Sequence, residues 1–75
     1  MLTAAQIRGA RAMLQIGQVE LAKLAGLSKT GLNHVENGND ARRSTLAAIQ
    51  AALEAAGIEI LEDNGVRLRK TLSAK

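Results

Sequence analysis

Glycines and helix-capping residues, rather than prolines, divide this chain into short segments. The 75 residues include seven glycines and no proline. Thr3 predicts the start of a first helix, because Gln6 stands three residues later and completes a capping box. Ile7, Ala10 and Leu14 then recur at the spacing of one helix face, which predicts that this face is buried.

Two shorter helices follow, and only three residues separate them. Gly17 predicts the start of a helix over residues 18–25, and Gly26 ends it. Ser28 is the expected cap of the next helix, which runs to about Asn37. Two short helices spaced so closely predict a tight corner.

A longer helix and a change of period complete the pattern. Ser44 predicts the cap of an alanine-rich helix that runs through about Ala56. Over residues 58–70 apolar residues alternate with polar ones around an Asp-Asn-Gly sequence, which is typical of a β-hairpin. An isolated hairpin is marginally stable in water, so this one must pack on helices or on a second chain.

The hairpin can be closed by either of two loops. A two-residue loop at Asn64 and Gly65 would pair Leu61 with Leu68. A three-residue loop with Gly65 in a left-handed conformation would instead pair Ile60 with Leu68. The second arrangement is preferred because it gathers four apolar side chains on one face: Ile58, Ile60, Val66 and Leu68.

Aromatic residues and cysteine are absent, and each absence excludes a class of nucleic-acid-binding fold. Without Phe, Tyr or Trp, a sheet cannot stack single-stranded or RNA bases on aromatic rings. Without cysteine, and with His34 as the one histidine, the chain forms neither a zinc finger nor a disulfide. We expect no metal and no cofactor. The abundance of alanine and leucine favours helices and predicts a mainly α fold.

The net charge of +3 is distributed unevenly. Residues 1–43 carry six basic and three acidic side chains, residues 44–65 carry four acidic and no basic ones, and residues 66–75 carry four basic and no acidic ones. The basic first block suits a polyanionic partner. The two blocks behind it can neutralise each other, and the three-residue loop sets Glu59 opposite Arg69.

Residues 18–37 resemble the helix-turn-helix of the phage Cro/repressor, or Xre-type, family. The family's small, glycine and apolar positions are occupied by Leu21, Ala22, Ala25, Gly26, Leu27, Leu32 and Val35. The spacing also has physical reasons, because Ala22 lets the two helices cross closely and Gly26 can adopt a positive φ. The resemblance covers residues 3–56 and implies a four-helix, lambda-repressor-like DNA-binding domain, followed here by the β-hairpin. We expect one domain over residues 1–75.

The outward face of the second motif helix carries four side chains that can bond to base edges: Lys29, Thr30, Asn33 and His34. The resemblance implies that Lys29 and Thr30 are the main base-reading positions and that His34 is another. Lys29 can donate to guanine, and Thr30 can place its methyl group against that of thymine. Asn33 reads adenine only if its side chain reaches past the edge of the helix. An ordinary solvated helix face is the alternative for all four.

Phosphate contacts are expected at both ends of the motif. The resemblance implies that Gln18 and the start of its helix bind a backbone phosphate, as the free amides there attract an anion. Ser28 is foremost a helix cap and can contact DNA as well. Asn37, Arg42 and Arg43 occupy a region that the family uses for phosphates, although paired arginines in a loop are as readily just solvated.

Two positions leave alternatives open. Arg11 lies either near the DNA backbone or beside Glu36, which matches an acidic family position that is more often structural. Gly31 departs from the family, in which this position usually carries a side chain. The glycine either permits closer approach to DNA or marks relaxed specificity.

The resemblance implies a sequence-specific regulator of transcription that binds double-stranded DNA. We expect a repressor that acts as a homodimer on a palindromic operator, with two recognition helices in major grooves about 34 Å apart. The last helix and residues 57–71 are the expected dimerisation elements, through the face formed by Ile58, Ile60, Val66 and Leu68. The alternative is that both elements only cover the core of the monomer.

An antitoxin, which holds a toxin protein while its helix-turn-helix regulates the operon, is the second functional hypothesis. Catalysis is not expected, because the lone histidine has no glycine-rich nucleophile turn or paired carboxylates to accompany it. The sequence shows no signal peptide and no membrane-spanning apolar run. We therefore expect a cytoplasmic, nucleoid-associated protein without a membrane partner.

Overall fold

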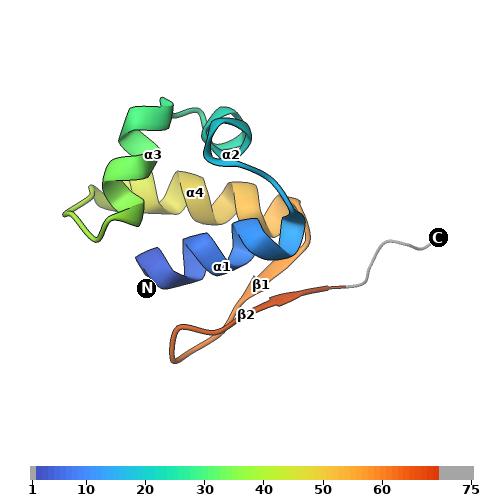
Figure 1. Ribbon diagram of the computed structural model, residues 1–75. Helices are drawn as coiled ribbons and strands as arrows, with labels where there is room; N and C mark the ends of the chain where they lie inside the picture. The colour runs from blue at the N-terminus through green and yellow to red at the C-terminus, as the bar shows by residue number, and fades with distance from the viewer. Residues whose placement is uncertain (1, 70–75) are drawn as a thin grey trace.

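Four helices are followed by a two-stranded antiparallel hairpin in the computed structural model, which describes residues 2–69. The elements are α1 (Ala4–Leu14), α2 (Gln18–Ala25), α3 (Lys29–Glu36), α4 (Arg43–Ala55), β1 (Ile58–Ile60) and β2 (Val66–Leu68). The predicted mainly α architecture is confirmed (Figure 1). Residues 70 and 71, which the sequence placed in the hairpin element, lie outside the described residues.

The predicted starts of the first three helices are confirmed, and side-chain caps fix two of them. The Thr3 hydroxyl accepts from the amide of Gln6 at 3.2 Å, and the Gln6 side chain accepts from the amide of Thr3 at 2.9 Å. Ser28 caps α3 by accepting from the amide of Gly31 at 3.0 Å. Gly26, with φ of 76°, ends α2 in the left-handed conformation that glycine adopts without strain. Local chemistry therefore determines these boundaries.

The start of α4 differs from the prediction. Arg42, not Ser44, is the N-cap residue, and no side chain bonds to the first amides of the helix. The backbone carbonyl of Arg42 accepts from the amide of Leu46 at 3.0 Å. Ala41 and Leu46 both pack against the core, so tertiary packing, rather than a side-chain cap, fixes where this helix begins.

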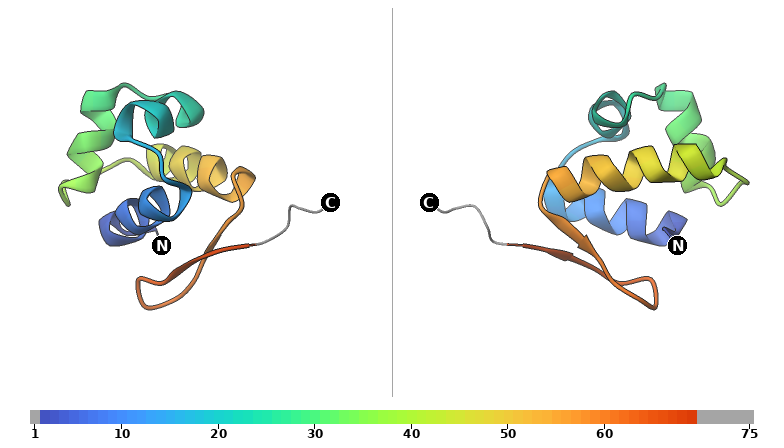
Figure 2. Two further views of the ribbon diagram at one scale, coloured as in Figure 1. Left: turned by 45° about the vertical axis from the view of Figure 1, so that its right-hand side comes forward. Right: turned by 180° about the vertical axis from the view of Figure 1, so that it is seen from behind.

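Each of the four helices and β1 contributes a side chain to one aliphatic core. Its fully buried large apolar members are Ile7, Leu21, Leu32, Ile49, Leu53 and Ile58. Leu21 and Leu32 anchor α2 and α3 on the same core, so the two helices of the corner are held in a fixed relation. Figures 1 and 2 show α2 and α3 on one side of the molecule and the hairpin on the other, with α1 and α4 between them.

The hairpin is present, but its predicted register is wrong. Ile58 pairs with Leu68, Glu59 with Arg67 and Ile60 with Val66, so each residue of β1 pairs two positions earlier in β2 than expected. A shift of two leaves the four apolar side chains on one face, as predicted, because strand side chains alternate.

The turn explains the difference in register. Asp63 and Asn64, with φ of 58° and 65°, take the left-handed conformations, and Gly65 does not. The amide of Gly65 donates to the carbonyl of Glu62 at 3.1 Å, as in the hairpin turns that have two positive φ angles. Asp and Asn tolerate this conformation better than other side chains, so the turn sits one residue earlier than the glycine suggested.

The apolar face of the hairpin covers the chain's own core. Gly9 in the middle of α1 lets β2 approach closely, because a Cβ atom there would lie 3.3 Å from Cγ2 of Val66. Ile58 is completely buried, Ile60 and Val66 are half-buried against the core, and Leu68 is 43% exposed. Of the four residues expected at a dimer interface, Ile58 therefore has no surface to offer a second chain.

Candidate nucleic-acid interface

The α2–α3 corner leaves one face of α3 outside the core. Ala22 is buried where the two helices cross, and its carbonyl accepts from the amide of Leu27 at 2.8 Å across the corner. The inner face of α3 is formed by Leu32, Val35 and Glu36, which are all buried. The opposite face is therefore presented to solvent.

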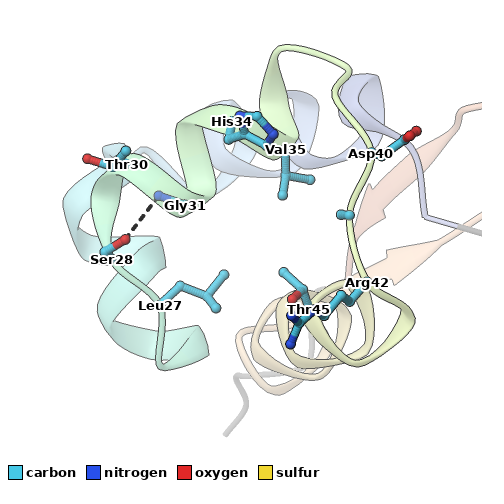
Figure 3. A pocket seen from close by; sticks show the side chains of 10 residues that line it. Leu27, Ser28, Thr30, Gly31, His34, Val35, Asp40, Arg42 and Thr45 are labelled. Atoms are coloured by element: carbon cyan, nitrogen blue, oxygen red, sulfur yellow. Dashed lines mark hydrogen bonds between the residues drawn. The ribbon is translucent and has the colours of Figure 1, made fainter.

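The four predicted base-reading side chains lie together on that outer face. They form two adjacent rows at i, i+4 spacing, Lys29 with Asn33 and Thr30 with His34, and all four are exposed. Figure 3 shows Leu27 and Val35 pointing into the space between α3 and α4. The outer face of α3 thus carries four polar side chains outside the core. Within residues 2–69, Asn33 is the one of the four whose side chain forms a hydrogen bond, with Gln18.

An open groove of about 460 Å³ separates α3 from the beginning of α4. Ser28, Thr30 and His34 line it from one side, and Arg42 and Thr45 line it from the other (Figure 3). Arg42 and Arg43 are both exposed, and within residues 2–69 neither forms an ion pair. Two predicted phosphate-binding arginines are therefore free to meet an anion beside α3.

Arg11 lies beside Glu36, as the second of the two alternatives left open by the sequence predicts. Its Nε lies 2.8 Å from Oε2 of Glu36, and its Nη2 lies 2.9 Å from Oε1. The side chain of Glu36 is only 3% exposed. Arg8 also donates to the backbone carbonyl of Glu36. The carboxylate on the inner face of α3 is thus neutralised by α1.

The same contacts perturb the pKa values of both groups. Burial alone would raise the pKa of Glu36, but hydrogen bonds from Arg11 and Gln18 and the charges of the neighbouring arginines outweigh it, so the pKa is lowered. The hydrogen bond to Glu36 raises the pKa of Arg11 despite its partial burial. The pair is therefore fully ionised at neutral pH.

Gln18 extends this ion pair to the outer face of α3. Its Nε2 donates to Oε1 of Glu36 at 3.0 Å and to Oδ1 of Asn33 at 3.1 Å. Both N–H bonds of the amide are thereby used, so in this arrangement a phosphate would be held by the backbone amides that begin α2. Sequence reasoning missed this connection, because its members are 15 and 18 residues apart.

The remaining predicted phosphate contacts lie at the two ends of α3. Ser28 uses its oxygen as the cap, while its hydroxyl hydrogen can still be donated. Asn37 is the exposed C-cap residue. A Cβ atom at Gly31 would lie 3.2 Å from the hydroxyl oxygen of Ser28, so a side chain there would require this hydroxyl to shift slightly.

Other kinds of site receive no support from the described residues. Over residues 2–69 no group of three His, Asp or Glu side chains is placed to hold a metal ion. Within the same range, no helix combines the length and the apolar character needed to cross a membrane.

Comparison with known protein families identifies α2 and α3 as part of a helix-turn-helix. A sequence model of a family described as helix-turn-helix matches residues 7–62, which include α2, α3, α4 and β1. A search of curated proteins found no significant match to the chain.

Proposed function

The chain belongs to the Xre/Cro-like helix-turn-helix family of DNA-binding regulators, and we propose that it represses transcription by recognising a specific operator in double-stranded DNA. The observation that carries this proposal is the outer face of α3. Lys29, Thr30, Asn33 and His34 gather there, exposed, on a helix whose other face is anchored in the core. A helix that is anchored in the core and exposes polar side chains on its outer face is what direct reading of the major groove requires.

Lys29, Thr30 and His34 can each contact base edges. Lys29 donates to O6 and N7 of guanine, and the methyl group of Thr30 packs against the methyl group of thymine. His34 lies one turn beyond Thr30 and reaches the next base pairs along the groove. The three side chains together can distinguish a short sequence.

Phosphate contacts on both sides of α3 would fix its position in the groove. Arg42 and Arg43 supply positive charge at the start of α4, where the first amides have no side-chain cap. Ser28 and Asn37 stand at the two ends of α3 and add neutral contacts. These contacts hold the protein on any sequence, whereas the outer face of α3 selects among sequences.

Selection followed by titration tests the proposal. The full chain is used to select bound duplexes from a random library, and its affinity for a selected duplex is compared at fixed salt with its affinity for scrambled duplexes. We expect at least about a thousandfold preference for the selected sequence. Equal affinity for selected and scrambled duplexes would show that the protein does not read sequence.

We also propose that the repressor acts as a homodimer on a palindromic operator. One α3 contacts few base pairs, and two copies double the contacts. The β-hairpin supports this proposal through its outer edge. The amides of Leu61 and Arg69 bond across the hairpin, so the alternation of an antiparallel pair directs the backbone amides of Val66 and Leu68 away from β1. Beside this unpaired edge, the side chain of Leu68 is exposed.

Sedimentation of matched leucine variants tests the dimer. Leu68→Lys should shift the monomer–dimer equilibrium toward the monomer and weaken operator binding, because the charge opposes pairing at the edge of β2. Leu24→Lys is the control, since Leu24 on α2 is 56% exposed and lies away from the hairpin. An equal effect of both variants, or no effect of Leu68→Lys, would remove the hairpin from the interface.

Action on an operator would place the protein in the cytoplasm, at the nucleoid. The alternative that the chain is an antitoxin stays a hypothesis, and co-purification of a small partner protein would favour it.

A further inference from the structure

We propose that the buried Arg11–Glu36 pair determines which end of the Asn33 amide faces DNA, so that Asn33 selects a hydrogen-bond acceptor on the operator. The inference rests on the proposed function, because it concerns how α3 reads DNA. Three contacts in series start in the interior of the protein and end at an exposed side chain. They join Arg11 to Glu36, Glu36 to Gln18, and Gln18 to Asn33.

The contact between Arg11 and Glu36 determines which groups in the series donate and which accept. An ionised carboxylate can only accept hydrogen bonds. Glu36 is ionised and buried, and both of its oxygens already accept from Arg11. A group that approaches Oε1 of Glu36 must therefore be a donor.

The contact between Glu36 and Gln18 fixes the orientation of the Gln18 amide. The two ends of an amide differ, since the nitrogen donates and the oxygen accepts. The end of Gln18 that lies against Glu36 must be Nε2, which is 3.0 Å from Oε1, because the amide oxygen would meet the carboxylate with like partial charges. The second N–H of the same nitrogen is then directed to Asn33.

The third contact orients Asn33. Because Nε2 of Gln18 can only donate, the end of Asn33 that faces it must be Oδ1, at 3.1 Å. The Nδ2 end, with two N–H bonds, is left for DNA. A bidentate contact to adenine needs a donor and an acceptor, whereas O6 and N7 of guanine, or a phosphate oxygen, need donors alone. The geometry therefore assigns Asn33 to an acceptor rather than to adenine.

Base and backbone analogues identify the acceptor. In a duplex selected by the wild-type chain, 7-deazapurines replace purines one at a time, and methylphosphonates replace single phosphates. Among the positions where substitution weakens the wild type, which include the contacts of Lys29 and of the arginines, we expect one at which the wild type loses about tenfold in affinity and Asn33→Ala loses nothing further. A 7-deazapurine at that position identifies a base edge, and a methylphosphonate identifies a phosphate.

The opposite orientation of Asn33 has its own signature. If Asn33 accepted from adenine, removal of one adenine's exocyclic amine would weaken the wild type and leave Asn33→Ala unaffected. That result would overturn the inference, as would an Asn33→Ala chain that binds every duplex like the wild type. Failure of the wild type to select any sequence would instead overturn the proposed function itself.

Gln18→Met tests whether orientation passes through Gln18, which acts as a positioning residue. Methionine has a similar length and cannot donate, so Asn33 becomes free to turn. We expect discrimination at the Asn33 contact to fall about tenfold, while discrimination at the other base pairs is kept. Gln50→Met is the matched control, because Gln50 on α4 also donates to a carboxylate, that of Glu54. Unchanged discrimination in Gln18→Met, or an equal loss in the control, would overturn the inference.

Discussion

Two ion pairs of similar length lie in two regions of this molecule and have different consequences. In the helix-turn-helix half, Arg11 and Glu36 are 2.8 Å apart and their side chains are 22% and 3% exposed. In the hairpin, Arg67 and Glu59 are 2.6 Å apart and 62% and 39% exposed. Breaking a buried pair leaves an unpaired charge in the interior, whereas water solvates the partners of an exposed pair. Burial, rather than the distance between the charged atoms, therefore determines which ion pair the stability of the fold depends on more.

The same contrast extends to the surfaces of the two regions. On α3 the polar face remains open and the ionised residue is turned inward against α1. In the hairpin the apolar face is turned inward, and Glu59 pairs with Arg67 in solvent. The first region exposes polar side chains, and the second covers the core.

Breaking each pair from its basic side gives the largest expected difference between the regions. Arg11→Met leaves the buried carboxylate of Glu36 without its ion-pair partner and should lower the free energy of unfolding by about 3–5 kcal/mol. Arg67→Met should lower it by less than about 1 kcal/mol. Urea denaturation of both variants measures the difference. Equal losses would contradict the distinction drawn from burial.

Acid should reveal the same buried pair through its pKa. Because the pKa of Glu36 is lowered in the folded protein, ionised Glu36 contributes stability that is fully present above the ordinary carboxyl pKa and is lost as the pH falls below it. In Arg11→Met the main lowering contact is gone and burial raises the pKa. The urea midpoint of this variant should therefore fall less over the same acid range. Parallel pH profiles would contradict this account of Glu36.

Removing one exposed arginine from each region should have different, smaller effects on DNA affinity and on its salt dependence. Arg43→Ala should weaken binding to all duplexes alike, by about 1 kcal/mol, and reduce the slope of log K against log salt by about 1, because one phosphate contact is lost. Arg67→Ala should leave the slope unchanged, since Arg67 is paired and lies in the hairpin. If the salt slope depended on Arg67 and not on Arg43, DNA would bind at the hairpin rather than beside α3, and this account would be contradicted.

The helix-turn-helix half was predictable because its signals are local. The capping box of Thr3 and Gln6, the left-handed Gly26 and the cap at Ser28 each act within three or four residues. The start of α4 was misplaced because packing of Ala41 and Leu46, and not a cap at Ser44, determines it. A capping serine predicts a helix start only where tertiary contacts agree.

Contacts between residues far apart in the chain could not be predicted from the sequence. Alternating apolar residues in the hairpin indicate a buried face, but they do not say whether it is buried in the chain's own core, as Ile58 is, or in a partner. Likewise, the sequence predicted both Gln18 and Asn33 as DNA-contacting residues without any sign that they bond to each other. The sequence did offer the pairing of Arg11 with Glu36 as one of two alternatives, and the structure confirms that pairing.

Titration of Lys29→Ala on the selected duplex and on its single-base-pair variants tests most directly whether α3 reads bases. Lys29 is exposed at the start of α3, so its loss should leave the fold intact. We expect the variant to lose about 1–3 kcal/mol on the selected duplex and to lose its preference at one base pair while it keeps the others. An unchanged ranking of all duplexes, with affinity lowered equally on each, would contradict the claim that this helix reads the operator.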